Sequence, residues 1–305
     1  MQNILITGAS GFVGQNLTNH LKNYNLITIS RKNGFDYHLI DNEFLDNNKI
    51  EIIIHLAGKA HDLKKTSNDS EYYEANTDLT ISLFDSFLKS NAKTFIYLSS
   101  VKAVKDFIET SLTEDTEPTP ISVYGKSKLE AEKYLLLQQL NNNKKLFILR
   151  PCMIHGPGNK GNLNLLYKFV SKNLPWPLGA FENKRSFCSI DNLNFIIEEL
   201  ISRDDISSGI YNIADDEPLS TNQIIQLMAS CRNQKSRILN INKSLIYVFT
   251  KIGDHIGLPF NSINLFKMTE NYIVCNYKIK NAIRKELPIS SVDGMRKTLS
   301  SFYLK

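Results

Sequence analysis

Short apolar runs alternate with stretches of helical periodicity along the first half of the chain. The runs predict strands at residues 3–7, 26–30, 51–58, 94–98 and 146–149. Apolar positions at helical spacing predict helices at residues 12–21, 72–88 and 122–140. The run at 51–58 is apolar almost throughout, as expected for a strand that is buried on both faces. Strands that alternate with helices in this way form a parallel, doubly wound α/β sheet.

The pattern changes after residue 151. Prolines and glycines between residues 156 and 179 predict long loops. A helix is expected over residues 192–202 and a short strand over residues 209–213. Ser220 and Gln223 have the spacing of a capping box in front of another apolar helix. The second half therefore predicts a smaller α/β region.

Composition narrows the class of protein. Of the 305 residues, 42% are hydrophobic and 22% are charged, which is typical of a globular chain. The net charge of +5 comes without a dense basic block, so no nucleic-acid interface is expected. The four cysteines are scattered and lack metal-ligand spacing, which indicates free thiols and no metal site. The longest apolar run of the second half, 245–249, is far below the ~20 residues that span a bilayer. With no signal-peptide pattern either, we expect a soluble, cytoplasmic protein without membrane insertion.

Three glycines follow the first predicted strand and open the next helix. Gly8, Gly11 and Gly14 would let the backbone approach a pyrophosphate, and the helix N-terminus would supply free N–H groups. The spacing is Gly-x-x-Gly-x-x-Gly rather than Gly-x-Gly-x-x-Gly. We therefore expect a Rossmann-type NAD(P)-binding domain over residues 1–151, to which later segments return. A smaller substrate-binding region is expected mainly over residues 152–305.

The end of the second predicted strand bears on the choice of cofactor. NAD-binding proteins commonly carry an acidic residue here, which binds the ribose hydroxyls. This chain has Ser30, Arg31 and Lys32 instead. Two positive charges suit a 2′-phosphate, so NADP(H) is expected to be preferred, and NAD(H) stays open as the alternative.

Tyr124 and Lys128 are the candidate catalytic pair. On a helix they lie on one face, and we expect the lysine cation to lower the pKa of the phenol. The tyrosine could then act as a general acid/base. Such pairs also arise by chance on amphipathic helices. Ser99 and Ser100 strengthen the functional interpretation, because they end a strand where open α/β sheets bind ligands.

Four motifs together resemble one family: residues 7–14, residues 55–58, Ser99-Ser100 with Tyr124-x-x-x-Lys128, and residues 149–158. The chain resembles the extended short-chain dehydrogenase/reductases of the NAD-dependent epimerase/dehydratase family, which act on nucleotide sugars. The resemblance implies catalytic roles for Ser100, Tyr124 and Lys128. It implies cofactor contacts for Gly8, Ser10, Gly11, Phe12, Val13, Gly14, Leu56, Ala57, Gly58, Asn76, Ser99, Tyr124, Lys128 and Pro151, beside the Arg31 inferred above. It implies substrate contacts for Lys59, Ser100, Lys102, Tyr124, Asn162, Leu163 and Arg185.

Departures from the family pattern bear on the reaction. Members that dehydrate nucleotide sugars have Asp-Glu after the catalytic serine or threonine. This chain has Val101-Lys102, so dehydration is not expected. Residues 177–179 and Arg185-Ser186 are similar to a subgroup that contains epimerases and reductases.

Three functions follow from this resemblance. The first is reduction at C4 of a UDP-4-keto-6-deoxy-N-acetylhexosamine, for surface-polysaccharide synthesis. The alternative is 4-epimerisation of UDP-glucose or UDP-N-acetylglucosamine, and a non-catalytic NAD(P)-binding sensor is the remote third. Relatives often pair through two helices, here 72–88 and 122–140, so a homodimer is left open.

Overall fold

The computed structural model describes residues 2–30, 36–60, 68–108, 110–141, 143–159, 161–257 and 261–303. Within these residues, six strands form one sheet in the order β2-β1-β3-β4-β6-β9, and every neighbouring pair is parallel. Their bounds are β1 Asn3–Thr7, β2 Asn25–Ile29, β3 Ile52–His55, β4 Thr94–Leu98, β6 Lys145–Pro151 and β9 Gly209–Ile213. The predicted doubly wound parallel sheet is confirmed.

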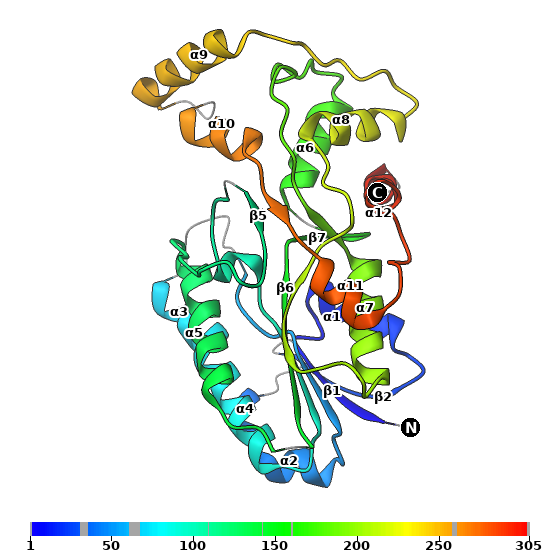
Figure 1. The fold of residues 1–305 in the computed structure, drawn as a ribbon. Coiled ribbons are helices and arrows are strands. Elements are labelled where there is room, and N and C mark those ends of the chain that lie inside the picture. Colours follow the sequence, from blue (N-terminus) through cyan, green and yellow to red (C-terminus); the bar gives the residue numbers. More distant parts are fainter. Residues whose placement is uncertain are drawn as a thin grey trace.

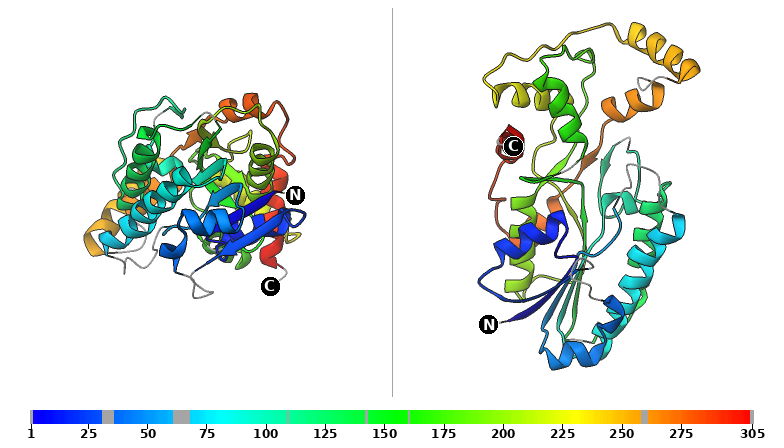
Figure 2. Two further views of the ribbon diagram at one scale, coloured as in Figure 1. Left: turned by 90° about the horizontal axis from the view of Figure 1, so that it is seen from below. Right: turned by 180° about the vertical axis from the view of Figure 1, so that it is seen from behind.

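Successive side chains of each strand pack into different cores. Ile4 and Ile6 of β1 face α1 (Phe12–His20) and α7 (Ile190–Ser202). Leu5, between them, faces the helices α2 (Asn42–Asn47), α4 (Leu79–Lys89) and α5 (Val123–Leu137). Figures 1 and 2 show these two helical layers on opposite sides of the sheet. Burial of both faces explains why the strands are continuous apolar runs.

A second region lies beyond the carboxyl ends of the strands (Figure 1). It contains α6 (Asn162–Ser171), α8 (Thr221–Ser230), α9 (Lys243–Ile256), α10 (Ser262–Thr269) and α12 (Ser291–Tyr303). Two small parallel sheets join it to the first region: β7 (Met153–His155) with β8 (Phe187–Ser189), and β5 (Ser111–Leu112) with β10 (Ile273–Val274). The region has its own apolar core around Trp176, Met228 and Leu299. None of the described helices is both long and apolar enough to cross a membrane.

Three local expectations can be compared with these elements. The capping box is present, because the Ser220 Oγ accepts from the Gln223 N–H and the Gln223 side chain accepts from the Ser220 N–H. The helix expected at 72–88 is instead divided into α3 (Asp69–Tyr73), a π turn at Glu74–Asp78, and α4. The later segments α7, β9 and α11 (Tyr277–Ile283) pack with the main sheet or its covering helices.

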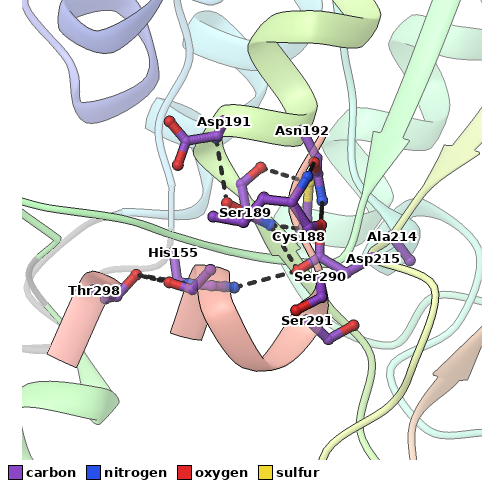
Figure 3. A network of polar contacts seen from close by, with 12 residues as sticks. His155, Cys188, Ser189, Asp191, Asn192, Ala214, Asp215, Ser290, Ser291 and Thr298 are labelled. Carbon is purple, nitrogen blue, oxygen red and sulfur yellow. Dashed lines mark hydrogen bonds and ion pairs between the residues drawn. The ribbon is translucent and has the colours of Figure 1, made fainter. Parts of the chain in front are cut away.

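A buried polar network ties the C-terminal helix to both regions (Figure 3). His155 at the end of β7 makes a 2.8 Å hydrogen bond through Nδ1 with the Thr298 hydroxyl of α12. Its Nε2 lies 3.4 Å from Asp215, which follows β9. Asp215 in turn accepts hydrogen bonds from the Ser189 N–H and the Asn192 side chain. The network therefore fixes α12 against β7, β8 and α7.

Candidate active site

The glycine loop lies between the carboxyl ends of β1 and β3, where the strand order reverses. Gly8 has φ +71°, and a Cβ placed on it would come 2.6 Å from the Ala57 nitrogen. A Cβ on Gly14 would come 2.4 Å from the Gly8 oxygen, so both positions require glycine. Gly11 caps α1 without a side chain, and the first backbone N–H groups of the helix follow it at Phe12 and Val13. This arrangement can bind a pyrophosphate through backbone N–H groups.

A shallow pocket of about 370 Å³ lies beside this loop, and its lining includes Ser10, Thr28 and Ser30. It reaches from the start of α1 to the end of β2. That is the side on which the sequence predicts the adenosine half of the cofactor. Arg31, the predicted 2′-phosphate ligand, lies outside the described residues together with Lys32.

The predicted catalytic residues come together at the start of α5. Ser122 caps this helix by accepting from the Gly125 N–H, and Asp106 accepts from the Ser122 N–H and hydroxyl. Tyr124 therefore stands in the first turn, where its phenol is hydrogen bonded to the Ser100 side chain. One turn further on, the Lys128 Nζ donates to the Leu98 carbonyl at 2.9 Å.

The electrostatics of this cluster differ from the prediction in one respect. Burial raises the pKa of Tyr124 above 10.0, although its hydrogen bond with Ser100 opposes the rise. The expected net lowering of the Tyr124 pKa is therefore wrong. Burial also lowers the pKa of Lys128 to about 8, and the Glu132 carboxylate opposes that change. At neutral pH the phenol is thus protonated and able to donate.

Glu132 and Arg150 support the cluster from behind, and the sequence analysis missed their pairing. The Arg150 Nε and Nη2 donate to the Glu132 carboxylate at 2.5–3.1 Å, with both side chains almost fully buried. The Ser99 hydroxyl donates to the same carboxylate. The spacing of Tyr124, Lys128 and Glu132, four residues apart each time, placed Glu132 on the catalytic face. Nothing local indicated its partner on β6.

Asn76 stands in the π turn and joins three parts of the site. Its Oδ1 accepts from the Lys59 N–H at 2.7 Å, and its Nδ2 donates to the Lys59 carbonyl and the Ser127 hydroxyl. A Cβ on Gly58 would come 2.7 Å from the Asn76 Oδ1 and 3.3 Å from the Lys128 Nζ. The structure therefore brings Gly58, Asn76 and Lys128 together, as the resemblance implied. π turns are frequent at functional sites.

His55, at the end of β3, is fully buried between β1 and α4. Its Nδ1 contacts the Thr7 hydroxyl at 2.7 Å, and its Nε2 contacts the Thr80 hydroxyl at 3.0 Å. Burial lowers its pKa to about 3, so the ring is neutral. The Thr80 hydroxyl donates to the Asn76 carbonyl, which makes the His55 Nε2–H the donor to Thr80. His55 thus joins β1 and β3 to the start of α4, next to the π turn.

Two of the residues that are predicted to bind the substrate, Lys102 and Arg185, both lie near Glu270. The Lys102 Nζ donates to the Asp106 carbonyl at 2.6 Å and lies 4.5 Å from the Tyr272 ring centroid. The Arg185 Nη1 donates to the Lys267 carbonyl at 2.7 Å and lies 3.5 Å from Glu270. Burial lowers the pKa of Lys102, and the Asp106 and Glu270 carboxylates oppose this. Arg185 therefore lies beside the Glu270 carboxylate, and Lys102 is close enough for this carboxylate to affect its pKa.

The remaining predicted ligands are more dispersed. Lys59 is ion-paired with Glu71 at the start of α3. Leu163 is 5% exposed and packs in the core of the second region. Asn162 begins α6, and its side chain lies outside the described part of the structure. Pro151 ends β6 and is buried beside β9.

Comparison with known proteins agrees with this geometry. Residues 4–214 match the model of the NAD dependent epimerase/dehydratase family. The chain belongs to this family. It is 31% identical over 246 residues to a UDP-glucose 4-epimerase of Vibrio cholerae, a match that covers 75% of each chain.

Two further proteins are similar to the chain. An N-acetyl-alpha-D-glucosaminyl-diphospho-ditrans,octacis-undecaprenol 4-epimerase of Escherichia coli O157:H7 is 28% identical, over 76% of this chain and 73% of the relative. The solved structure of RMD from Pseudomonas aeruginosa, complexed with NADPH, has a TM-score of 0.73 and 18% identity over the full length of both chains. The fold is therefore shared with solved structures that contain NADPH, as in RMD, or NAD, as in a UDP-glucuronic acid 4-epimerase of Bacillus cereus.

Proposed function

We propose that the protein transfers a hydride at C4 of a sugar that is carried on a diphosphate, using a nicotinamide cofactor. The observation that carries the proposal is the contact between Ser100 and Tyr124 beside the buried Lys128. A phenol that is hydrogen bonded to a hydroxyl, with a lysine one turn away, supports proton transfer to or from a sugar oxygen.

The residues of the first region fit the cofactor. Gly8 packs so closely on Ala57 that a Cβ would clash there, and this packing brings the uncapped start of α1, with its free backbone N–H groups, to the carboxyl end of β1, where a pyrophosphate could be held. Bound NAD(P) would supply or accept the hydride at C4. Tyr124 would move the proton of the C4 oxygen, and the Ser100 hydroxyl would hold that oxygen. The raised pKa of Tyr124 suits proton donation to a C4 ketone, a step that epimerisation and reduction share.

We place 4-epimerisation first among the reactions, because both curated relatives above are named as 4-epimerases and match three quarters of the chain. Reduction of a UDP-4-keto-6-deoxy-N-acetylhexosamine is the second candidate, which the sequence prediction had put first. Arg31 and Lys32 favour it, since they suit NADPH. We propose a uridine diphosphate as the carrier, held by Arg185 and Lys102, whose guanidinium and ammonium groups suit phosphate oxygens.

The bound cofactor and the product separate the two reactions. Purified protein is denatured to identify any retained cofactor, and fresh protein is then given UDP-glucose or UDP-N-acetylglucosamine without added reductant. Epimerisation predicts retained NAD and interconversion of the C4 epimers. Consumption of NADPH with the 4-keto-6-deoxy sugar, and no interconversion, would establish the reductase instead.

Tyr124→Phe tests the catalytic assignment in either case. The variant should lose turnover and keep cofactor affinity, because only the proton-carrying hydroxyl is removed. Lys126→Ala, an exposed position on the same helix, is the matched control and should remain active. A Tyr124→Phe enzyme with normal activity would refute the acid/base role.

The preference for NADP(H) that accompanies the second candidate has its own test. Charge-assisted hydrogen bonds from Arg31 to a 2′-phosphate should favour NADP(H) by about tenfold, which requires ~1.4 kcal/mol. Arg31→Ala should weaken NADPH binding and leave NADH binding unchanged in a fluorescence titration. Equal losses for both cofactors would contradict the assignment.

A further inference from the structure

Helix α9 presents an apolar stripe to solvent. Leu245, Val248, Phe249, Ile252 and Ile256 are each between 51 and 65% exposed. Their spacing of three and four residues puts them on one side of the helix. The neighbouring side, with Ile246, Thr250 and Gly253, is the one buried against the protein. The exposed stripe therefore does not contribute to the packing of α9 on the rest of the protein.

Helix α10 extends this exposed apolar surface. Ile263 is 65% exposed and Phe266 is 51% exposed. The Ser262 N–H and hydroxyl donate to the Asp254 carboxylate, which fixes the start of α10 against α9. We call the seven exposed apolar residues of the two helices the α9–α10 surface. Exposed apolar residues grouped in this way mark interaction sites.

The stretch of chain that contains this surface carries the net charge of the protein. Residues 231–269 contain six basic side chains and one acidic side chain, a net +5 that equals the formal net charge of the whole chain. The remaining residues therefore hold 30 basic and 30 acidic side chains. The one acidic residue, Asp254, is already engaged by Ser262. A partner of this surface is thus expected to be both apolar and anionic.

We propose that the α9–α10 surface docks on an anionic lipid bilayer. An interfacial helix of this kind lies in the plane of the membrane, with its apolar stripe in the acyl boundary and its lysines near the headgroups. Lys251 is exposed beside the stripe and suits that position, and Lys243 is exposed in the first turn of the same helix. With 14 residues, α9 is about 21 Å long and is suited to lie on a bilayer rather than to cross it.

A second copy of the chain fits the surface less well. A two-fold interface would place the same patch on both subunits, so that Lys243, Lys251 and Lys267 of one copy would face the same lysines of the other. An anionic bilayer instead offers the opposite charge to these lysines. Charge complementarity therefore favours the bilayer.

The docked position would bring the candidate active site close to the membrane. The Phe266 ring packs edge-on against the Phe107 ring at 5.2 Å, and Phe107 is itself 44% exposed. Arg185 donates to the carbonyl of Lys267 on α10. A helix that contacts these residues and also the bilayer would hold the substrate side of the site near the lipid surface. The docking itself does not depend on the proposed function.

Vesicle sedimentation tests the proposal. The full chain is mixed with vesicles of phosphatidylcholine alone or of phosphatidylcholine with phosphatidylglycerol, at low and high salt. We expect sedimentation with the anionic vesicles, weakened by salt and by removal of phosphatidylglycerol. The double variant Phe249→Ser/Ile252→Ser should bind about tenfold more weakly, because the stripe supplies the apolar part of the affinity. Lys243→Glu/Lys251→Glu should lose the preference for anionic lipid.

Leu137→Ser is the matched control, since Leu137 is 80% exposed on α5, away from this surface. It should bind vesicles like the wild type. Thermal unfolding of each variant shows that the fold is kept. The proposal is overturned if the wild type ignores both kinds of vesicle, or if the stripe variant binds as the wild type does. A wild-type dimer that the stripe variant dissociates, without vesicle binding, would identify a second copy as the occupant instead.

Discussion

At the scale of one residue, the burial of Lys128 lowers the stability of the fold. It is 5% exposed, and burial lowers its pKa from 10.5 to about 8. Between these two values the unfolded chain binds a proton that the folded chain has released. The free energy of unfolding therefore rises with pH through this window, by up to about 3 kcal/mol from this group.

We expect Lys128→Met to remove that rise. Urea unfolding of the wild type and the variant at several pH values from about 8 to 10.5 measures it as the difference between two curves. Groups common to both proteins cancel in this difference. Parallel curves would show that folding does not lower the pKa of Lys128.

Glu132 is the residue that balances the two buried cations beside it. Replacing it in Glu132→Gln leaves the Arg150 guanidinium in the core without a counter-charge. Loss of one partner of a buried pair costs about 3–5 kcal/mol, so a large drop in the urea midpoint is expected. Glu130→Gln, at an exposed position of the same helix, should change little. A Glu132→Gln protein as stable as this control would contradict the pairing.

At the scale of elements, the π turn is the clearest departure from the sequence pattern. Apolar spacing predicted one helix over residues 72–88, because side chains on both flanks still face the core. The turn depends on contacts with other segments: Asn76 bonds to Lys59 and Ser127, and the Thr77 hydroxyl donates to the Ser127 carbonyl. No local periodicity encodes such partners.

Asn76→Asp tests whether the π turn positions residues 57–59. The carboxylate can still accept from the Lys59 N–H, but it cannot donate to the Lys59 carbonyl or the Ser127 hydroxyl. We expect a loss of about 1–3 kcal/mol in stability and weaker cofactor binding, because residues 57–59 lose an anchor. Cofactor titration and amide exchange at Lys59 measure the two effects. Asp78→Asn, exposed in the same turn, is the control and should leave both unchanged.

At the scale of the whole molecule, the sequence predicted the single strands and helices, and it missed contacts between segments that are far apart in the chain. The strands of the sheet are apolar runs, and Tyr124 and Lys128 share one helix, so both could be predicted directly. The contact between Arg150 and Glu132 depends on the packing of β6 beside α5. The exposure of the apolar stripe of α9 depends on which side of that helix packs on the second region. The length of the apolar run at 245–249 showed only that it is too short to span a membrane. It gave no sign that these residues form an exposed surface.

The buried network of Figure 3 joins the two regions through the C-terminal helix, and Thr298→Val tests this role. The change keeps the shape of the side chain but leaves the His155 Nδ1 without its hydrogen-bond partner. An unsatisfied buried polar atom costs about 1–3 kcal/mol, so the free energy of unfolding should fall by that amount. Amide exchange should rise first in α12, because this helix loses its tie to β7. Cofactor affinity should stay unchanged, since the glycine loop lies on the other region. Ser300→Ala, at an exposed position of α12, should leave stability and exchange as they are; a similar loss there would show that the helix, not the network, is responsible.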